Sequence, residues 1–397
     1  MKTRRLTVRR ITASLLVATL AGCGVHPSGG STPAVGSPPG TTGPTPSPFP
    51  RPRSEKPLPG MPPPLDPHDV YAADRPGALA ARLAQVRPMV WVPNSKGRTV
   101  DVIDPTTFSV VRRITVGVNP QHVVPSWDLQ TLWVNNDKGN SLTPIDPATG
   151  VVGKELPVHD PYNLYFTPDG RSAVVMASKD RQVVFRDPHT MAVQEAVAVP
   201  CAGVNHADFT ADGRTMVISC EFDGRLVSLD VATHRVRAML ELPGGGKPQD
   251  VKLSPDGSTF YIADMARNGV WLLDAVSFTI TRLVPTGAGA HGLYVSRDSR
   301  TMYVTDRGAG QITLLDPVAG KVRGHWPIPG HASPDMGGLS VDGTVLWVSG
   351  RYDGEVYAID TTTGQLLHRI TVGAGPHGLC VWPQPGRYSL GHTGVMR

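Results

Sequence analysis

The chain has 397 residues, a formal net charge of +5 and a hydrophobic fraction of 40%. Five basic residues lie among the first ten, so the rest of the chain is neutral. That neutrality excludes nucleic-acid binding driven by bulk charge, and we expect no nucleic-acid partner.

The N-terminus has the features of an export signal. Its basic residues precede an apolar stretch over residues 11–21, which is too short for a lasting transmembrane helix. The stretch ends in Leu-Ala-Gly-Cys23, which resembles the lipobox of bacterial lipoproteins. We predict a signal peptide over residues 1–22 and a lipid on Cys23. The alternative is an ordinary signal peptide with an incidental cysteine.

A lipid on Cys23 predicts a location on the extracytoplasmic face of the bacterial cell membrane, with release to the exterior and both Sec and Tat export left open. Residues 23–67 are rich in Pro, Gly, Ser and Thr, which predicts a disordered tether. In the lead-in over residues 68–88, Leu79, Leu83 and Val86 fall at helical spacing. They predict one short helix lying on the main domain.

A segment of about forty residues recurs seven times over residues 89–386, a period typical of stacked or radially arranged units. Each copy carries one aspartate at a fixed place: Asp104, Asp146, Asp187, Asp230, Asp274, Asp316 and Asp360. These aspartates follow apolar runs, where a carboxylate accepts backbone N–H groups and begins a turn. We assign them this structural role.

Each copy also holds short β-branched and aromatic runs, such as TFYIAD (259–264) and VWLLD (270–274), without helical periods between them. Tight-turn sequences such as SPDG (254–257) separate the runs. The pattern predicts an all-β domain.

The repeats resemble those of the YVTN-repeat, or YncE-like, β-propellers. The resemblance spans the whole domain and rests on WVPN (91–94), YVTD (303–306), WVSG (347–350), VDVIDPTT (100–107) and ITVGAGPHGLCV (370–381). It implies a seven-bladed β-propeller with four-stranded blades, and we expect a monomer. It implies no particular function, because propellers host many unrelated ones.

The phase of the repeat predicts how the ring closes. The first copy begins at Met89 with the second strand of a blade, and the last ends at residues 378–382 with a first strand. Pairing these two strands completes the seventh blade and leaves no open edge. The tail over residues 387–397 lies beyond closure and has no assigned role.

The resemblance also implies that the strand after each P-x-G turn lines the central channel. Folding each hairpin about its turn then places polar residues opposite one another at one mouth. The expected pairs are His122 with Asn136, Asn163 with Ser178, His206 with Cys220, Asp250 with Asp264, His291 with Asp306, Asp335 with Arg351, and His377 with Asn94.

Imidazole, carboxylate and thiolate groups gathered at one mouth are potential metal ligands. A metal ion, if bound, is expected at His206, Cys220, Asp250 and Asp264. The alternatives are a solvated polar funnel for a small polar ligand, and a structural propeller that binds a macromolecule by its outer faces. No other cofactor is assigned, and a lyase-like or a haem- or copper-binding propeller stays an alternative.

The sequence predicts different states for the cysteines of the domain. Cys201 and Cys220 fall at the same mouth, and an exported protein meets oxidising conditions, so either a disulfide or two free thiols fits the sequence. Cys380 alternates within GLCVW and is expected in the core.

No catalytic residue follows from sequence motifs. Residues 287–292 and 373–378 both match G-x-G-x-x-G, but they precede strands rather than helices and are turns. Enzymatic activity stays undecided. The first hypothesis is a cell-envelope binding or scaffolding module for a small polar ligand or an envelope protein. The alternatives are a metal- or cofactor-dependent enzyme or redox factor that uses the His/Asp ring, and a structural surface protein.

Overall fold

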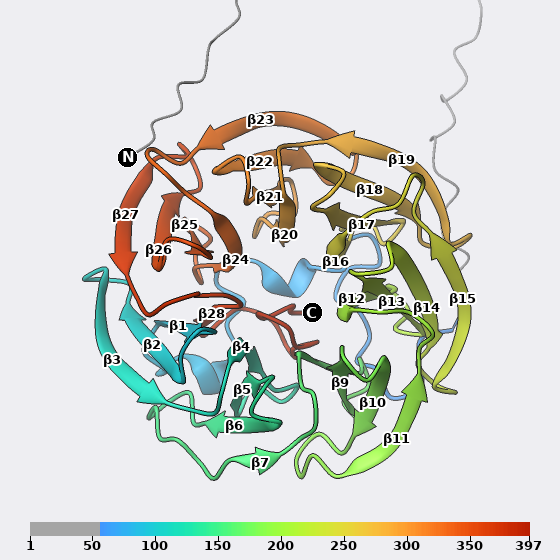
Figure 1. Cartoon of the computed structure of the whole chain (residues 1–397), viewed down its shortest axis with the longest axis horizontal. Helices are drawn as coiled ribbons and strands as arrows, with labels where there is room; N and C mark the ends of the chain where they lie inside the picture. The colour runs from blue at the N-terminus through green and yellow to red at the C-terminus, as the bar shows by residue number, and fades with distance from the viewer. Residues whose placement is uncertain (1–55) are drawn as a thin grey trace, which may run out of the picture. The chain divides into compact units, whose positions relative to one another are not determined.

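The computed structural model describes residues 56–397, so the predicted signal peptide, Cys23 and most of the tether lie outside the described residues. These residues form seven four-stranded antiparallel sheets, arranged as blades around a central channel (Figure 1). The predicted seven-bladed β-propeller is therefore confirmed. Within residues 56–397, no helix has the length and apolarity needed to cross a membrane.

Each blade runs from an innermost to an outermost strand. The innermost strands are β4 (Pro120–Pro125), β8 (Asn163–Phe166), β12 (Val204–Phe209), β16 (Pro248–Leu253), β20 (Ala290–Val295), β24 (Pro334–Leu339) and β28 (Cys380–Trp382). The second strands are β5 (Leu132–Asn136), β9 (Ala173–Ala177), β13 (Thr215–Cys220), β17 (Thr259–Asp264), β21 (Met302–Asp306), β25 (Val345–Gly350) and β1 (Met89–Asn94).

The outer half of each blade completes the sheet. The third strands are β6 (Ser141–Ile145), β10 (Gln182–Arg186), β14 (Arg225–Asp230), β18 (Gly269–Asp274), β22 (Gln311–Asp316), β26 (Glu355–Asp360) and β2 (Thr99–Asp104). The outermost strands are β7 (Leu156–Pro157), β11 (Val193–Ala198), β15 (Arg235–Glu241), β19 (Thr279–Pro285), β23 (Lys321–Pro327), β27 (Leu366–Thr371) and β3 (Ser109–Thr115).

The ring closes as the repeat predicts. Strand β28 pairs with β1, with Met89 opposite Trp382 and Trp91 opposite Cys380, so one blade contains both ends of the repeat array. Cys380 is a buried free thiol, as expected.

The seven repeat aspartates also have the predicted role. The Oδ1 atom of each accepts a hydrogen bond from a backbone N–H two or three residues later, at 2.7–2.9 Å. They begin the turns that join the third and fourth strands, so none takes part in the channel chemistry.

Apolar side chains between neighbouring blades form the core. Phe260 and Ile262 of β17, for example, pack against Val217 of β13 and Leu226 of β14, and all four are fully buried or nearly so. Burying one such side chain contributes about 1.5–3 kcal/mol, which holds the blades in a rigid ring around the channel.

The two ends of the channel differ. We call the end at which the innermost strands begin the arginine end, because Arg307 and Arg351 lie there, directly after β21 and β25. We call the opposite end, where the innermost strands finish, the tail end. The N-terminal lead-in crosses the tail end, where Val70 N donates to Pro255 O at 2.8 Å.

The lead-in corrects two sequence predictions. The tether was expected to reach residue 67, but Leu58 is only 4% exposed and its N–H bonds to Asp212 O at 2.8 Å. Two apolar side chains in the Pro-rich segment, Leu58 and Met61, pack against the blade core and dock it. The expected helix over residues 77–86 is also wrong. The lead-in contains only two single 3-10 turns, η1 (Ala72–Asp74) and η2 (Ala81–Leu83).

The apolar residues of the lead-in still pack against the main domain, as their spacing predicts. Leu83 is buried against the blade core, and Leu79 and Val86 pack beside it. Helix formation is costly to begin, and a segment this short without a side-chain N-cap lacks the bonds to offset that cost.

Candidate metal centre in the central channel

β-Bulges determine which side chains enter the channel. In five blades the ladder between the first two strands skips two residues of the inner strand. In the first of these, Pro120 pairs with Asn136 and Val123 with Val134, so Gln121 and His122 face a single residue. The other four bulges lie between Val204 and Ala207, Pro248 and Val251, Ala290 and Leu293, and Pro334 and Gly337. Such bulges bend a strand and re-aim its side chains.

The bulges correct the expected pairs across the mouth. The residue opposite Asn136 is Pro120 rather than His122, and the residue opposite Asp264 is Pro248 rather than Asp250. Cys220 likewise lies opposite Val204 rather than His206. Asp306 and Asn94 lie opposite Ala290 and Pro376, one residue from His291 and His377. Arg351 does lie beside Asp335 as expected, with its Nε atom 3.8 Å from Asp335 Oδ2.

Four residues of the expected ring lie at the ends of second strands and form hydrogen bonds within their own blades. Asn136 donates to Thr143 Oγ1 at 2.9 Å, and Asp264 accepts from Lys247 N and Trp271 Nε1, each at 2.9 Å. Asn94 and Asp306 are likewise bonded to third-strand side chains, Asp101 and Thr313. These four residues end the second strands and do not join the cluster in the channel.

Cys201 and Cys220 form a disulfide, with their Cα atoms 6.0 Å apart. Cys220 therefore has no thiolate to offer a metal ion. Of the expected ligand set, Cys220 and Asp264 do not converge with His206 on one point.

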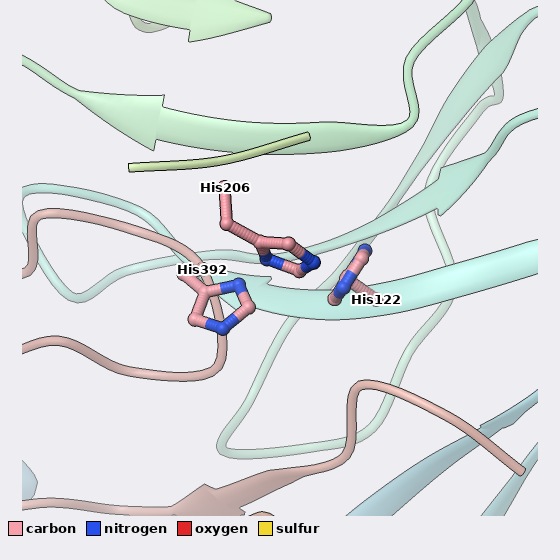
Figure 2. Close-up of side chains that lie close together, drawn as sticks. All are labelled: His122, His206 and His392. Carbon is pink, nitrogen blue, oxygen red and sulfur yellow. The ribbon is translucent and has the colours of Figure 1, made fainter. Parts of the chain in front are cut away.

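Three buried histidines do converge. One ring nitrogen of each of His122, His206 and His392 lies within 4.8 Å of the corresponding nitrogens of the other two, and all three side chains are essentially inaccessible to solvent. Figure 2 shows the three rings facing one common region, from β4, β12 and the C-terminal segment.

Backbone groups that precede two neighbouring inner strands position His122. The Nδ1–H group of His122 donates to Tyr162 O at 2.9 Å, which leaves the lone pair of Nε2 free. The ring lies against Gly378, where an added Cβ would overlap the His122 Cδ2 atom. Glycine at residue 378 is therefore required for this ring orientation.

Asn163 lies between the other two histidines. Its Nδ2 atom is 2.9 Å from His392 Nδ1 and 3.3 Å from His206 Nδ1, while its Oδ1 accepts from Leu164 N. Two imidazole nitrogens thus already converge on one positively polarised atom. Asp250 lies beyond, with Oδ1 3.7 Å from His392 Nε2, and accepts from Val251 N and Leu293 N at 2.9 Å.

His392 comes from the tail, which folds as a hairpin over residues 387–397. Its strands are joined by Leu390 N–H to Val395 O at 2.7 Å, and its turn is Gly391-His392-Thr393-Gly394. His392 has φ +53°, a left-handed conformation that is uncommon for a residue other than glycine.

The tail hairpin docks on the free edge of β8. Phe166 N donates to Leu390 O at 2.9 Å and His392 N donates to Leu164 O at 2.8 Å. This is strand addition to an exposed sheet edge, and it inserts the turn of the hairpin into the channel from the tail end. Figure 1 shows the C-terminus at the centre of the ring.

The arginine end holds a second group around Asp335, which is fully buried. His377 Nδ1 lies 2.6 Å from Asp335 Oδ2, and His291 Nδ1 lies 3.0 Å from Oδ1 without hydrogen-bond geometry. Arg307 pairs with the same carboxylate through Nε at 3.1 Å and through Nη2, and Arg351 Nε lies 3.8 Å away. The pKa of Asp335 is well below its usual range despite burial, because Arg307 and the two histidines favour the carboxylate.

The two groups are in contact through their rings. The His377 ring centroid is 4.9 Å from that of His122, and the His291 centroid is 6.1 Å from that of His206. Five histidines therefore surround one section of the channel.

Each of the five has a buried ring nitrogen with no hydrogen-bond partner within residues 56–397: Nε2 of His122, His206, His377 and His392, and Nδ1 of His291. Leaving such groups without a partner costs about 1–3 kcal/mol each. Burial lowers the pKa of His122 to about 4 and holds the pKa of His206 and that of His392 well below the usual value. The rings are therefore neutral at pH 7, the form that binds metal ions.

A family model for YNCE-like β-propellers matches residues 69–385. The chain belongs to this family. No curated protein matches the sequence. The structure of this YNCE-like propeller is similar to that of hydrazine synthase from Kuenenia stuttgartiensis, with 19% identity and a TM-score of 0.60, covering 70% of this chain and 93% of that one.

Two further solved structures are similar to this YNCE-like propeller. A functionally unknown protein from Desulfotomaculum acetoxidans has 16% identity and a TM-score of 0.64, covering 74% of this chain and 98% of that one. The dihydro-heme d1 dehydrogenase NirN has 15% identity and a TM-score of 0.58, covering 80% of this chain and 78% of that one. At these identities the similarity concerns the fold alone, and the site must be understood from its own residues.

His392 is the residue of this YNCE-like propeller that the sequence analysis missed. The sequence signal was limited to a hairpin turn, GHTG (391–394) between the short segments YSL and VMR, and did not place that turn in the channel. The site of the propeller is therefore completed by a segment outside the repeat.

Proposed function

We propose that this propeller binds one transition-metal ion in its central channel, with His122, His206 and His392 as ligands. The observation that carries the proposal is the convergence of three buried imidazole nitrogens within 4.8 Å of one another. Neutral imidazole suits zinc, copper, iron and nickel rather than magnesium or calcium.

The geometry is close to that of a bound site but wider. With metal–nitrogen bonds of about 2.0–2.1 Å, tetrahedral ligands stand about 3.3 Å apart, so the rings must approach one another by up to roughly 1.5 Å. The His392 side chain lies on a hairpin turn, which can shift more easily than the inner strands β4 and β12.

Groups beside the other ring nitrogens of the histidines support the proposal. Metal-bound histidines usually donate their other ring N–H to a carbonyl or a carboxylate, and such partners fix the ring orientation. Tyr162 O has this relation to His122, and Asp250 lies 3.7 Å from His392 Nε2. Three protein ligands leave a fourth metal position for a small molecule, the arrangement found in catalytic rather than structural zinc sites.

Metal content tests the proposal. Protein covering the propeller and its tail is stripped with a chelator, loaded separately with Zn(II) and Cu(II), desalted and analysed for metal. About one ion per chain is expected for the wild type, with most of it lost in His206→Asn and His392→Asn. Asparagine tolerates the left-handed φ of residue 392, so the second variant removes the imidazole with little strain.

A matched control separates the site from surface binding. His189 has a side chain that is 73% exposed, and His189→Asn should leave the metal content unchanged. Equal metal content in the wild type and both channel variants would refute the proposed site.

We further propose that the propeller is held at the outer face of the bacterial cell membrane by a lipid on Cys23. The basic and apolar order of the first 22 residues supports this location, and the disulfide between Cys201 and Cys220 suits an oxidising compartment. Mass spectrometry of the mature N-terminus tests it, and a terminus other than Cys23 without an acyl group would overturn it.

A further inference from the structure

The group around Asp335 carries more positive charge than its carboxylate neutralises. Arg307 makes the close ion pair with Asp335, while Arg351 Nε remains 3.8 Å from it. The Nη1 atom of Arg351 donates to two neutral acceptors, Ser95 Oγ at 3.0 Å and Gly375 O at 3.4 Å. One guanidinium charge therefore has no full counter-charge here.

The other acid nearby does not supply that counter-charge. Glu221 accepts from Asn205 Nδ2 at 2.5 Å and has Lys247 Nζ 3.9 Å from its Oε1. Burial raises the pKa of Glu221, and Lys247 balances its charge when it is ionised.

Two hydrogen-bond donors in this region have no acceptor among the residues that the structure describes. Arg351 Nη2 makes no hydrogen bond, although its side chain is only 22% exposed. The Tyr162 hydroxyl makes none either, while the Tyr162 ring lies 5.6 Å from the His122 ring and 6.0 Å from the His206 ring. The Tyr162 ring thus borders the three-histidine site.

His377 links the two groups. Asp335 Oδ2 accepts from His377 Nδ1 and is also the oxygen nearest Arg351, and the His377 ring is 4.9 Å from His122. Its Nε2 atom is buried and has no partner. A free lone pair and an unbonded hydroxyl therefore lie next to the proposed metal ligands, and the Arg351 guanidinium is connected to them through Asp335 and His377.

We infer that a small inorganic anion binds at the arginine end of the channel as the outside ligand of the metal ion, held by the Arg351 guanidinium and the Tyr162 hydroxyl. The inference rests on the proposed metal site. Arg351 supplies the charge and a charge-assisted hydrogen bond, Tyr162 supplies a second donor, and His377 Nε2 can accept from an anion that carries a proton. The small polar ligand predicted from the sequence is thus proposed to be an inorganic anion at the arginine end of the channel.

Azide titration of the Cu(II)-loaded protein tests the inference, because azide bound to copper has a charge-transfer absorption band. The band is expected to saturate in the wild type, and the azide Kd should rise roughly ten- to a hundredfold in Arg351→Gln. Arg267 is an exposed arginine at the same end that bonds only to Gly244 O, so Arg267→Gln is the control for the loss of one positive charge and should change the Kd less than threefold.

A second variant keeps the test decisive if Arg351→Gln fails to fold. Because the Tyr162 hydroxyl has no hydrogen-bond partner among residues 56–397, Tyr162→Phe should fold and load copper normally, and its azide Kd should still rise several-fold. Equal azide Kd values in the wild type, Arg351→Gln and Tyr162→Phe, all loaded with copper, would overturn the anion site alone. Failure to load copper, seen before azide is added, would overturn the proposed function and the anion site with it.

Discussion

Replacing Arg397 with methionine tests whether the tail hairpin holds the third histidine in place. Arg397 is 6% exposed, and its Nη2 donates to Asp208 at 3.0 Å and 3.3 Å while the guanidinium lies 4.5 Å from the centre of the Tyr71 ring. This buried pair lies five residues from His392, so it anchors the tail hairpin at the tail end of the channel.

The expected loss of folding stability depends on the hydrogen bonds that Asp208 still accepts in the variant. Removing one partner of a buried ion pair costs about 3–5 kcal/mol. Asp208 still accepts from Phe209 N and Leu253 N, each at 2.8 Å, so the lower end applies and Arg397→Met should cost about 3 kcal/mol. Chemical unfolding measures this loss as a lower midpoint. The double variant with Asp208→Asn should recover part of it, because no buried charge is left unpaired.

The same variant should weaken metal binding. If the hairpin loses its anchor, His392 is held in place for only part of the time, and the apparent affinity falls in proportion to the docked fraction. A loss of roughly ten- to a hundredfold is expected, as for other residues that position a ligand, and competition with a chromophoric chelator measures it.

Arg387→Met is the matched control for Arg397→Met. Arg387 lies in the same hairpin and stacks on Tyr388, with its guanidinium 5.7 Å from the ring centre, but it pairs with no carboxylate among residues 56–397. It should change both quantities little. Arg397→Met with wild-type stability and wild-type metal affinity would refute the view that the ion pair docks the tail.

Three further predictions concern other parts of the molecule. Gly378→Ala should displace the His122 ring, because the new methyl group would overlap it, and should lower metal affinity at least tenfold in the chelator competition. Burial raises the pKa of Asp74 to about 6, so the native state holds this proton more tightly than the unfolded chain. Asp74 should therefore make stability fall by up to roughly 3 kcal/mol as the pH rises from about 4 to about 6. Asp74→Asn should lose this share of the fall when unfolding midpoints are compared, and keep the share of Asp250, whose pKa burial also raises to about 6. Replacing Cys201 and Cys220 together with alanine should cost about 3 kcal/mol in chemical unfolding, because the disulfide closes a loop with a sequence separation of 19.

Each of these predictions has its own control. Gly324 lies in an outer strand, where an added Cβ meets nothing closer than 3.9 Å, so Gly324→Ala should keep wild-type metal affinity. Parallel pH profiles for the wild type and Asp74→Asn would contradict the Asp74 argument. Reduced and oxidised wild-type protein with equal midpoints would contradict the disulfide argument.

The fold could be predicted because its determinants repeat. Seven aspartates at a constant spacing, each followed by turn chemistry, fix the number of blades, and the phase of the first and last copies fixes the closure between β28 and β1. If the strands of one copy are assigned wrongly, the other six copies still give the correct fold. The lead-in has no such redundancy, and there the helix expected from three apolar residues proved to be a single 3-10 turn.

The candidate site could be predicted only in part. His122, His206, His291, Asp335 and His377 lie buried on the stretches that begin the inner strands, which the repeat identifies. Most of their cross-strand partners could not be predicted, since a bulge adds one residue to the inner strand and moves the pairing away from a simple hairpin count. Alternation along a strand shows no sign of a bulge when all its residues are buried, as they are in β4.

His392 was beyond the sequence for a different reason. A tail outside the repeat has no equivalent segments to compare with, and its docking depends on the free edge of β8, which exists only in the folded ring. The channel histidines of the repeat supply two of the three nitrogens, and the tail supplies the last. Metal binding in this propeller should therefore be linked to tail docking: the ion favours the docked hairpin by the same free energy with which the hairpin favours the ion. A site built in this way can change its affinity through the tail alone, without any change in the blades.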